Sequence, residues 1–188
     1  MHRTPLDRMH CSLARTVDVV GEWWTPLILR DLFAGITRFE DLRRDLGIAS
    51  NVLTERLARL TKHGVVERRP YQQAPTRWEY VLTDQGKDLL PVVAALMRWG
   101  DRWKAGPGGP PALLVHHGCG RPASPRLVCA HCGGEVTADE VTAIAGPGGR
   151  IGPGTRIIGP LLAERAWART QTRAGAKRQT RRRPRVTR

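Results

Sequence analysis

Hydrophobic residues recur at helical spacing in four stretches of the first 63 residues. In each stretch the apolar positions lie three or four residues apart, which is typical of a helix that packs one face against a core. A glycine follows each stretch, and Ser12, Thr25 and Ser50 stand where N-caps are favoured. The pattern predicts helices at 13–20, 26–34, 39–46 and 50–63.

The period of the pattern changes from helical to two after Gly64. Residues 66–71 and 77–82 are predicted strands on either side of a short turn, and every other residue of the second strand is large and apolar. Two short helices joined by a tight turn, followed by a two-stranded hairpin, predict a helix-turn-helix with a wing. The usual use of this shape is to bind duplex DNA.

A fifth helix is predicted from Thr83, as its N-cap, to about Lys104. Pro91 lies inside it and is expected to kink it. A helix that is apolar nearly all round must be covered on more than one side, so we expect a second copy of the chain to cover this one. Its apolar residues are Leu89, Leu90, Val92, Val93, Leu96, Met97, Trp99 and Trp103.

The predicted fold class is mainly α with a small β-wing, plus a short C-terminal zinc-ribbon-like module and a basic tail. Stretches rich in Gly and Pro separate these parts. A DNA-binding and dimerisation domain is expected at 1–104, and the Cys/His module at 112–141. The Gly/Pro- and Arg-rich tail at 146–188 is expected to be disordered, apart from a helical turn or two at 161–168.

The helix predicted at 50–63 carries polar and basic residues opposite its leucines. Such a face is most often only solvated, but in a helix-turn-helix the second helix enters the major groove. Asn and Arg suit bidentate contacts with base edges, and other basic residues hold phosphates. The candidates for bases or nearby phosphates are Ser50, Asn51, Thr54, Arg56 and Arg59. The other candidate DNA-binding residues are Arg38, Arg43, Arg44, Lys62, Arg68, Arg69 and Arg77.

The chain is strongly basic, with a net charge of +14, and this favours polyanions such as nucleic acid. Ten Lys or Arg residues and one acid lie between Glu164 and Arg188, so the tail accounts for most of the charge. Two interpretations of the tail stay open: a phosphate binder without sequence preference, and a solvated extension without function.

No apolar run approaches the roughly 20 residues that a membrane helix needs, and the N-terminus lacks the apolar stretch of a secretory signal. We therefore expect a cytoplasmic, nucleoid-associated protein. In a reducing compartment, the four cysteines are expected to be thiols or metal ligands before disulfides.

Two Cys/His pairs lie in the predicted module. His116 and Cys119 are three residues apart, as are Cys129 and Cys132, and a glycine follows each pair. Three Cys and one His make a closed tetrahedral site for structural zinc, with no position for a catalytic water. A ribbon of unmetallated thiols is the alternative. Two further histidines compete with His116 as the fourth ligand: His117 and His131.

Residues 11–100 contain several specific motifs. These are a Cys before the first helix, WT before LILRDL at 24–32, LTERL at 53–57 and EYVLTDQG at 79–86. With them the stretch resembles the HxlR-type family of winged helix-turn-helix regulators, within the MarR-like superfamily of bacterial proteins. The resemblance implies a homodimer built from the first and last helices, bound to a palindromic operator. We expect a transcriptional repressor.

Cys11 directly precedes the first predicted helix, where the partial positive charge of a helix N-terminus lowers the pKa of a thiol. His10 and Arg15 are near in sequence and add to this effect. Several HxlR-type proteins use a Cys at this place, so the resemblance implies a redox or electrophile sensor. The alternative is a small residue buried at a dimer seam.

The sequence does not indicate an enzyme. Cys129 and Cys132 have the spacing of a thiol oxidoreductase motif, but Gly133 and Gly134 follow where a long helix is required. The sequence has no phosphate-binding glycine loop and no credible Ser/His/Asp grouping. The alternative to a sequence-specific regulator is a non-specific architectural nucleic-acid-binding protein that uses the zinc ribbon and the basic tail.

Overall fold

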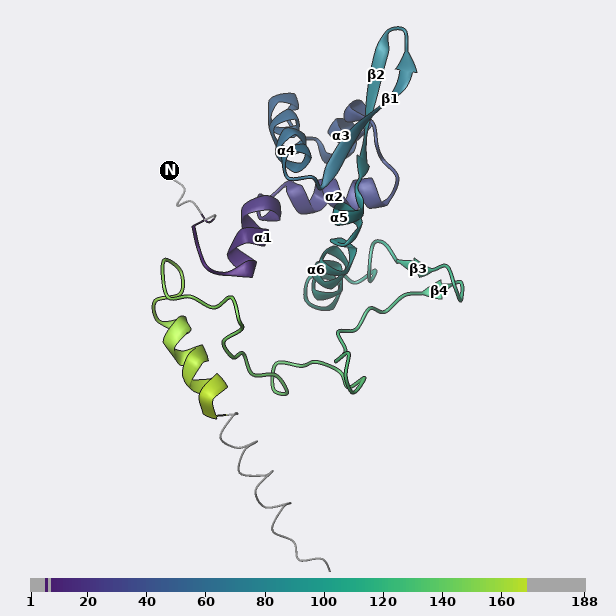
Figure 1. Cartoon of the computed structure of the whole chain (residues 1–188). Helices are drawn as coiled ribbons and strands as arrows, with labels where there is room; N and C mark the ends of the chain where they lie inside the picture. Colours follow the sequence, from purple (N-terminus) through teal and green to yellow (C-terminus); the bar gives the residue numbers. More distant parts are fainter. Residues whose placement is uncertain (1–5, 7, 169–188) are drawn as a thin grey trace, which may run out of the picture. The chain divides into compact units, whose positions relative to one another are not determined.

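The computed structural model describes residue 6 and residues 8–168 (Figure 1). The helices are α1 Ser12–Val20, α2 Thr25–Phe33, α3 Phe39–Leu46, α4 Ser50–Lys62, α5 Asp84–Lys87 and α6 Leu90–Trp103. The strands are β1 Val66–Gln73, β2 Thr76–Leu82, β3 Val115–His116 and β4 Arg121–Pro122. The predicted helix-turn-helix with a wing is therefore confirmed. Among the described helices, none is long and apolar enough to cross a membrane.

The core of the winged domain is formed by side chains of α2, α3, α4, β1 and α6. Leu53, Leu57 and Leu60 of α4 are almost fully buried, as their spacing predicted. Burying this face of α4 leaves its opposite face in solvent. The other members of the buried cluster are Ile28, Leu29, Leu32, Leu42, Ile48, Val65, Val66 and Val93.

Three helix starts differ from the prediction, because Ser12, like Thr25 and Ser50, is the first residue of its helix and not the residue before it. The N-caps of α2 and α4 are Trp24 and Ala49, and neither forms a side-chain hydrogen bond with its helix. Thr25 and Ser50 are instead the first helical residues. Thr83 is a cap as predicted, because its hydroxyl accepts a hydrogen bond from the Gly86 N–H at 3.1 Å.

The fifth predicted helix is in fact two helices, and the predicted kink at Pro91 is wrong. The chain leaves α5 after Lys87, and α6 begins at Leu90, so Pro91 lies in the first turn of α6. An N–H at that position has no intrahelical partner, so its absence in proline costs nothing. Pro91 therefore starts a helix and does not bend one.

The wing is the antiparallel pair of β1 and β2, whose register runs from Val66 opposite Leu82 out to the turn. Its base is bound to the segment before α3. The Tyr80 N–H donates to the Thr37 carbonyl at 2.8 Å, and the Thr37 hydroxyl donates to the Glu79 carboxylate at 2.9 Å. These two bonds hold the wing beside the helix-turn-helix.

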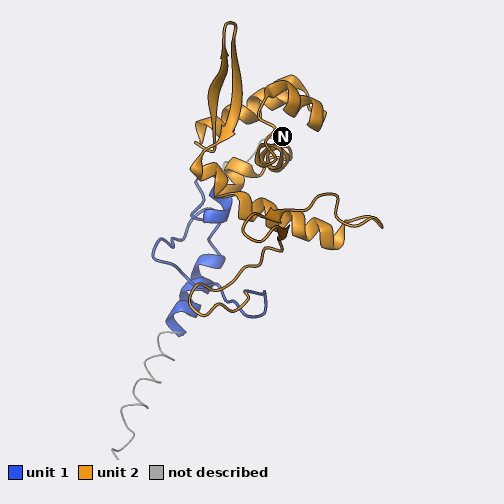
Figure 2. Cartoon of the chain, turned by 90° about the vertical axis from the view of Figure 1, so that its right-hand side faces the viewer, with its two compact units in different colours: residues 1–15, 136–188 blue, residues 16–135 orange. Residues whose placement is uncertain are grey.

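The chain divides into two compact units, residues 16–135 and the described part of 1–15 with 136–188 (Figure 2). In the second unit, the hydroxyl of buried Thr155 donates to the Arg150 carbonyl at 2.7 Å. Residues 158–168 are helical. The helical turn or two predicted at 161–168 is therefore present, and residues 169–188 lie outside the described residues.

Candidate nucleic-acid interface

The outward face of α4 begins with three exposed polar residues, Ser50, Asn51 and Thr54. The Thr54 hydroxyl donates to the Ser50 carbonyl at 2.8 Å, so only its acceptor capacity is left for a partner. Among the described contacts, the Asn51 side-chain amide has no hydrogen-bond partner. An amide with a free donor and a free acceptor matches the N6 and N7 edge of adenine.

The N-terminus of α4 adds a favourable electrostatic environment for an anion. Its N-cap, Ala49, has no side-chain group that accepts hydrogen bonds from the first N–H groups of the helix. These N–H groups and the helix dipole favour a phosphate oxygen at this end. Ser50 is thus an outward residue of the first turn and not a cap.

The sequence pattern predicted Arg59 on this outward face and Arg56 on its flank, both as DNA contacts, but in the structure both side chains are held in ion pairs. The Arg56 side chain is 15% exposed and pairs with Glu22 at 3.3 Å. Arg59 pairs with the Asp18 carboxylate at 2.9 Å and donates to the Asp18 carbonyl at 2.6 Å. Both arginines therefore brace α4 against α1 and the turn that follows it.

Sequence analysis did not identify Asp18 and Glu22 as functional residues. The only available signal was complementary spacing, because two acids four residues apart face two arginines three residues apart. Spacing alone does not say which helices meet. The two acids connect the N-terminal helix directly to the helix predicted to read DNA.

The basic residues of α3 are exposed and only weakly paired. Arg43 lies 2.9 Å from Glu40, and Arg44 lies 3.8 Å from Asp41. Exposed pairs of this kind contribute about 0–1 kcal/mol, so phosphate oxygens can replace the carboxylates. Lys62, at the end of α4, is also exposed. The structure therefore leaves these cations available for the DNA backbone.

Two aromatic rings of the wing have arginines lying over them, one from the wing itself and one from the N-cap of α3. The Arg68 guanidinium is 4.6 Å from the centre of the Trp78 ring, and Arg38 is 4.6 Å from that of Tyr71. Stacking holds a guanidinium in place and leaves its N–H groups free to donate. Arg77 is exposed, whereas Arg69 is held by Glu67 at 2.8 Å. The wing thus carries ordered cations at its surface.

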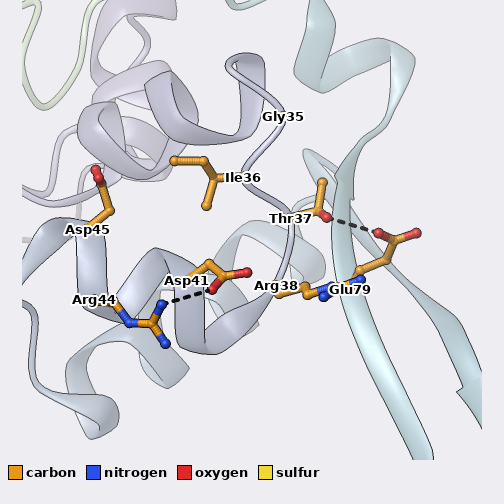
Figure 3. Close-up of a pocket in the computed structure, with 8 residues that line it drawn as sticks. All are labelled: Gly35, Ile36, Thr37, Arg38, Asp41, Arg44, Asp45 and Glu79. Atoms are coloured by element: carbon orange, nitrogen blue, oxygen red, sulfur yellow. Dashed lines mark hydrogen bonds and ion pairs between the residues drawn. The ribbon is translucent and has the colours of Figure 1, made fainter.

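A hollow lies where the segment before α3 meets β2, and Figure 3 shows its lining residues. Acidic and basic side chains share it, and the Thr37–Glu79 and Arg44–Asp41 contacts cross it. Pockets for small molecules are mostly apolar with a few polar groups. This charged, open hollow is instead a surface formed by the segment before α3, by α3 and by β2.

Asp31 is the buried carboxylate of the winged domain. It is 2% exposed and accepts from the Arg30 Nε at 2.8 Å, while its second oxygen, Oδ2, has no partner in the described structure. Burial raises the pKa of Asp31, although the Arg30 guanidinium opposes this effect. Arg30 also lies 3.3 Å from Asp45, so it links α2 to α3.

Cys11 lies where the sequence places it, directly before α1, and it is half-buried. Its carbonyl accepts a hydrogen bond from the Arg15 N–H at 3.1 Å, which extends the helical bonding to Cys11. Asp18, the partner of Arg59, lies in α1, the helix that follows Cys11 in the chain.

The structure brings the four predicted metal ligands together only as two pairs. The His116 Nδ1 lies 3.5 Å from the Cys119 Sγ. The backbone N–H groups of His131 and Cys132, and the Cys132 side chain, lower the pKa of the Cys129 thiol. Within the described residues, no three His, Cys, Asp or Glu side chains converge on a metal position. The zinc site remains a prediction.

Comparison with known proteins identifies the relatives of this chain. Residues 19–106 match the family described as HxlR-like helix-turn-helix. The HTH-type transcriptional regulator Rv3095 of Mycobacterium tuberculosis is 49% identical over 137 residues, which cover 73% of this chain and 87% of that protein. The HTH-type regulator sll1512 of Synechocystis is 37% identical over 94 residues, 50% of this chain and 70% of that protein.

Two solved structures have a similar fold. PA1607, a protein assigned as a transcription factor, aligns with a TM-score of 0.68 and 35% identity, over 76% of this chain and all of that chain. PA1374 of Pseudomonas aeruginosa, assigned likewise, aligns with a TM-score of 0.52 and 42% identity, over 73% and 93% of the two chains. These relatives and this fold are those of transcriptional regulators and not of enzymes.

Proposed function

Because the chain belongs to the HxlR-like helix-turn-helix family of transcriptional regulators, we propose that it represses transcription as a homodimer bound to a palindromic operator. The observation that carries the proposal is the open first turn of α4. There the free Asn51 amide and the unfilled helix N-terminus occur together with exposed cations on α3 and on the wing.

Base contacts are assigned to the first turn of α4, and phosphate contacts to the elements around it. Asn51 and Thr54, which are exposed on this turn, are the residues proposed to meet base edges, and exposed Ser50 is proposed to meet a nearby phosphate. The phosphate contacts come from side chains that are exposed or stacked and not buried in ion pairs. These are Arg38, Arg43, Arg44, Lys62, Arg68 and Arg77.

A second copy of the chain supplies the missing cover for α6. Leu96, Trp99 and Trp103 of this helix are 56%, 58% and 61% exposed, and α1 buries none of its residues. Large apolar side chains that are exposed together favour association. In a two-fold dimer the same patch meets itself, so the two α4 helices face two half-sites of a palindrome. A dimer over a promoter then blocks transcription.

Cys11 is the proposed switch. It precedes α1, and α1 with its following turn holds α4 through the Asp18–Arg59 and Glu22–Arg56 pairs. A covalent change at the start of α1 therefore has a direct route to the DNA-reading helix. If oxidants release DNA equally well from wild type and from Cys11→Ser, this part of the proposal fails.

The test of the function is protection of DNA near the gene of the protein by the purified full chain. A protected palindrome, lost in Asn51→Ala and retained in Asn51→Gln with altered base preference, supports sequence-specific repression. Binding without sequence preference that disappears at moderate salt would instead indicate an architectural protein. Sedimentation of the wild type and of Leu96→Asp tests the dimer, because a charge in the apolar patch is expected to give monomers.

A further inference from the structure

The two Cys/His pairs lie on two hairpins that repeat the same backbone structure. The hairpins are residues 115–122 and 128–135, eight residues each. In the first, Val115 pairs antiparallel with Pro122, and in the second Val128 pairs with Glu135. The two segments share few residues beyond one Val, one Cys and one Gly. The same backbone geometry therefore occurs twice in largely different sequences.

The turn of each hairpin is built on one hydrogen bond and one glycine. The Gly120 N–H donates to the His116 carbonyl at 2.8 Å, and the Gly133 N–H donates to the Cys129 carbonyl at 2.8 Å. Gly120 and Gly133 have φ angles of 68° and 71°, a left-handed conformation that side chains with a Cβ rarely adopt. Each turn therefore places the second and fifth residues of its hairpin next to each other.

Matching the two hairpins by their strand register pairs the residues that carry the donor atoms. His116 matches Cys129, and Cys119 matches Cys132, whereas His117 and His131 fall at positions that do not match each other. A Cβ at Gly118 would come within 3.0 Å of the His116 ring, so this glycine leaves room for the ring beside Cys119. The repeated geometry therefore favours His116, and not His117 or His131, as the fourth metal ligand.

The hairpins have no apolar core of their own. None of the described residues 105–135 is buried, and Val115 and Val128 are both more than half exposed. A segment this short needs a disulfide, a metal or a partner to hold a fold. The five residues 123–127 between the hairpins span at most about 17 Å, so the two donor pairs stay within reach of each other.

We propose that His116, Cys119, Cys129 and Cys132 bind one Zn²⁺ ion and that this ion closes the two hairpins into one unit. Three thiolates and one imidazole fill a tetrahedral shell, which is a structural site. The alignment with Rv3095 spans 137 of the 188 residues. Neither the part of the chain before residue 115 nor the part after residue 135 is that long, so the aligned region includes both hairpins. The site is independent of the DNA-reading helix.

The test is metal binding by the reduced full chain. We expect one zinc per chain by elemental analysis, and a cobalt-loaded form whose thiolate charge-transfer bands disappear in Cys129→Ser. His116→Ala loses tight binding, His116→Cys keeps it with stronger charge transfer, and the matched controls His117→Ala and His131→Ala keep it unchanged. Far-UV circular dichroism and DNA binding confirm that each variant folds.

Three results would overturn the proposal. If the reduced chain binds neither zinc nor cobalt in a fixed ratio, the hairpins are not a metal site. If His131→Ala loses the metal while His116→Ala keeps it, the repeat has assigned the wrong ligand. A Cys129–Cys132 disulfide in protein purified without oxidants would also contradict it, because an oxidised pair is not a zinc ligand.

Discussion

The winged domain and the Cys/His hairpins are neighbours in one chain, yet they are held together in different ways. The winged domain has eleven buried apolar residues in one cluster, while residues 105–135 have none among the described side chains. Both regions have hairpins and tight glycine turns, so local structure does not distinguish them. What differs is apolar surface removed from water, which is the main source of stability in the first region and is missing in the second.

The largest expected effect is on the core. Leu57→Ala removes a fully buried side chain, and we expect the free energy of unfolding to fall by about 2–5 kcal/mol because a cavity is left. Leu127→Ala, at a position 69% exposed between the two hairpins, is the matched control and should change it by less than about 0.5 kcal/mol. Urea unfolding measures both. Equal losses would show that the two regions share one core.

Removal of the metal should destabilise the Cys/His hairpins and leave the winged domain unchanged. A zinc chelator is expected to make the amides of 115–135 exchange rapidly with solvent, because the proposed metal is the main constraint on the hairpins. The amides of α4 should keep their protection, since this helix contributes Leu53, Leu57 and Leu60 to the buried cluster. Hydrogen exchange with and without added zinc measures this. Loss of protection in α4 would contradict the independence of the two regions.

Within the winged domain, Arg59 and Arg77 separate bracing from DNA binding. Arg59→Gln breaks the pair with Asp18 and should lower the free energy of unfolding by about 1–2 kcal/mol, without changing the salt dependence of DNA binding. Arg77→Gln should leave stability unchanged. It should reduce the slope of log K against log salt by about 0.9 for each phosphate that Arg77 neutralises. Asp18→Asn is the control for Arg59, and reversed results would restore Arg59 as a DNA contact.

The smallest effect concerns Asp31. Burial raises the pKa of its carboxyl above the ordinary 3.8, so the folded state binds this proton more tightly than the unfolded state does. Burial of the charged carboxylate therefore lowers the free energy of unfolding. This loss of stability is fully present above the raised pKa and disappears below 3.8. Wild type should therefore gain stability relative to Asp31→Asn as the pH falls through this window. Urea unfolding at several pH values tests it, and a constant difference between the two proteins would contradict it.

The sequence predicts most of the fold because helix and strand periods are local. The positions of α1 to α4, the wing, and the inward leucines of α4 follow from spacing alone. The start of α6 at Leu90 was missed because a proline such as Pro91 kinks a helix when it lies in the interior and is favoured when it lies in the first turn.

The site was harder to predict because it depends on neighbours in space. Asn51 and Thr54 were placed on the open face by their distance from the leucines, which is a local property. Arg56 and Arg59 lie on the flank of the same helix, and their role depends on α1, which covers that flank. Likewise, the two Cys/His pairs are visible in the sequence, but whether they meet depends on a ligand.

Selection of duplexes from a random pool by the reduced full chain, at about 0.15 M salt, tests the central claim most directly. We expect enrichment of one palindrome with half-sites about 10 base pairs apart, centre to centre, and a changed preference at one position of each half-site in Asn51→Gln. Recovery of duplexes without a common sequence, or with a motif that Asn51→Gln leaves unchanged, would contradict the assignment of α4 as the helix that reads the operator.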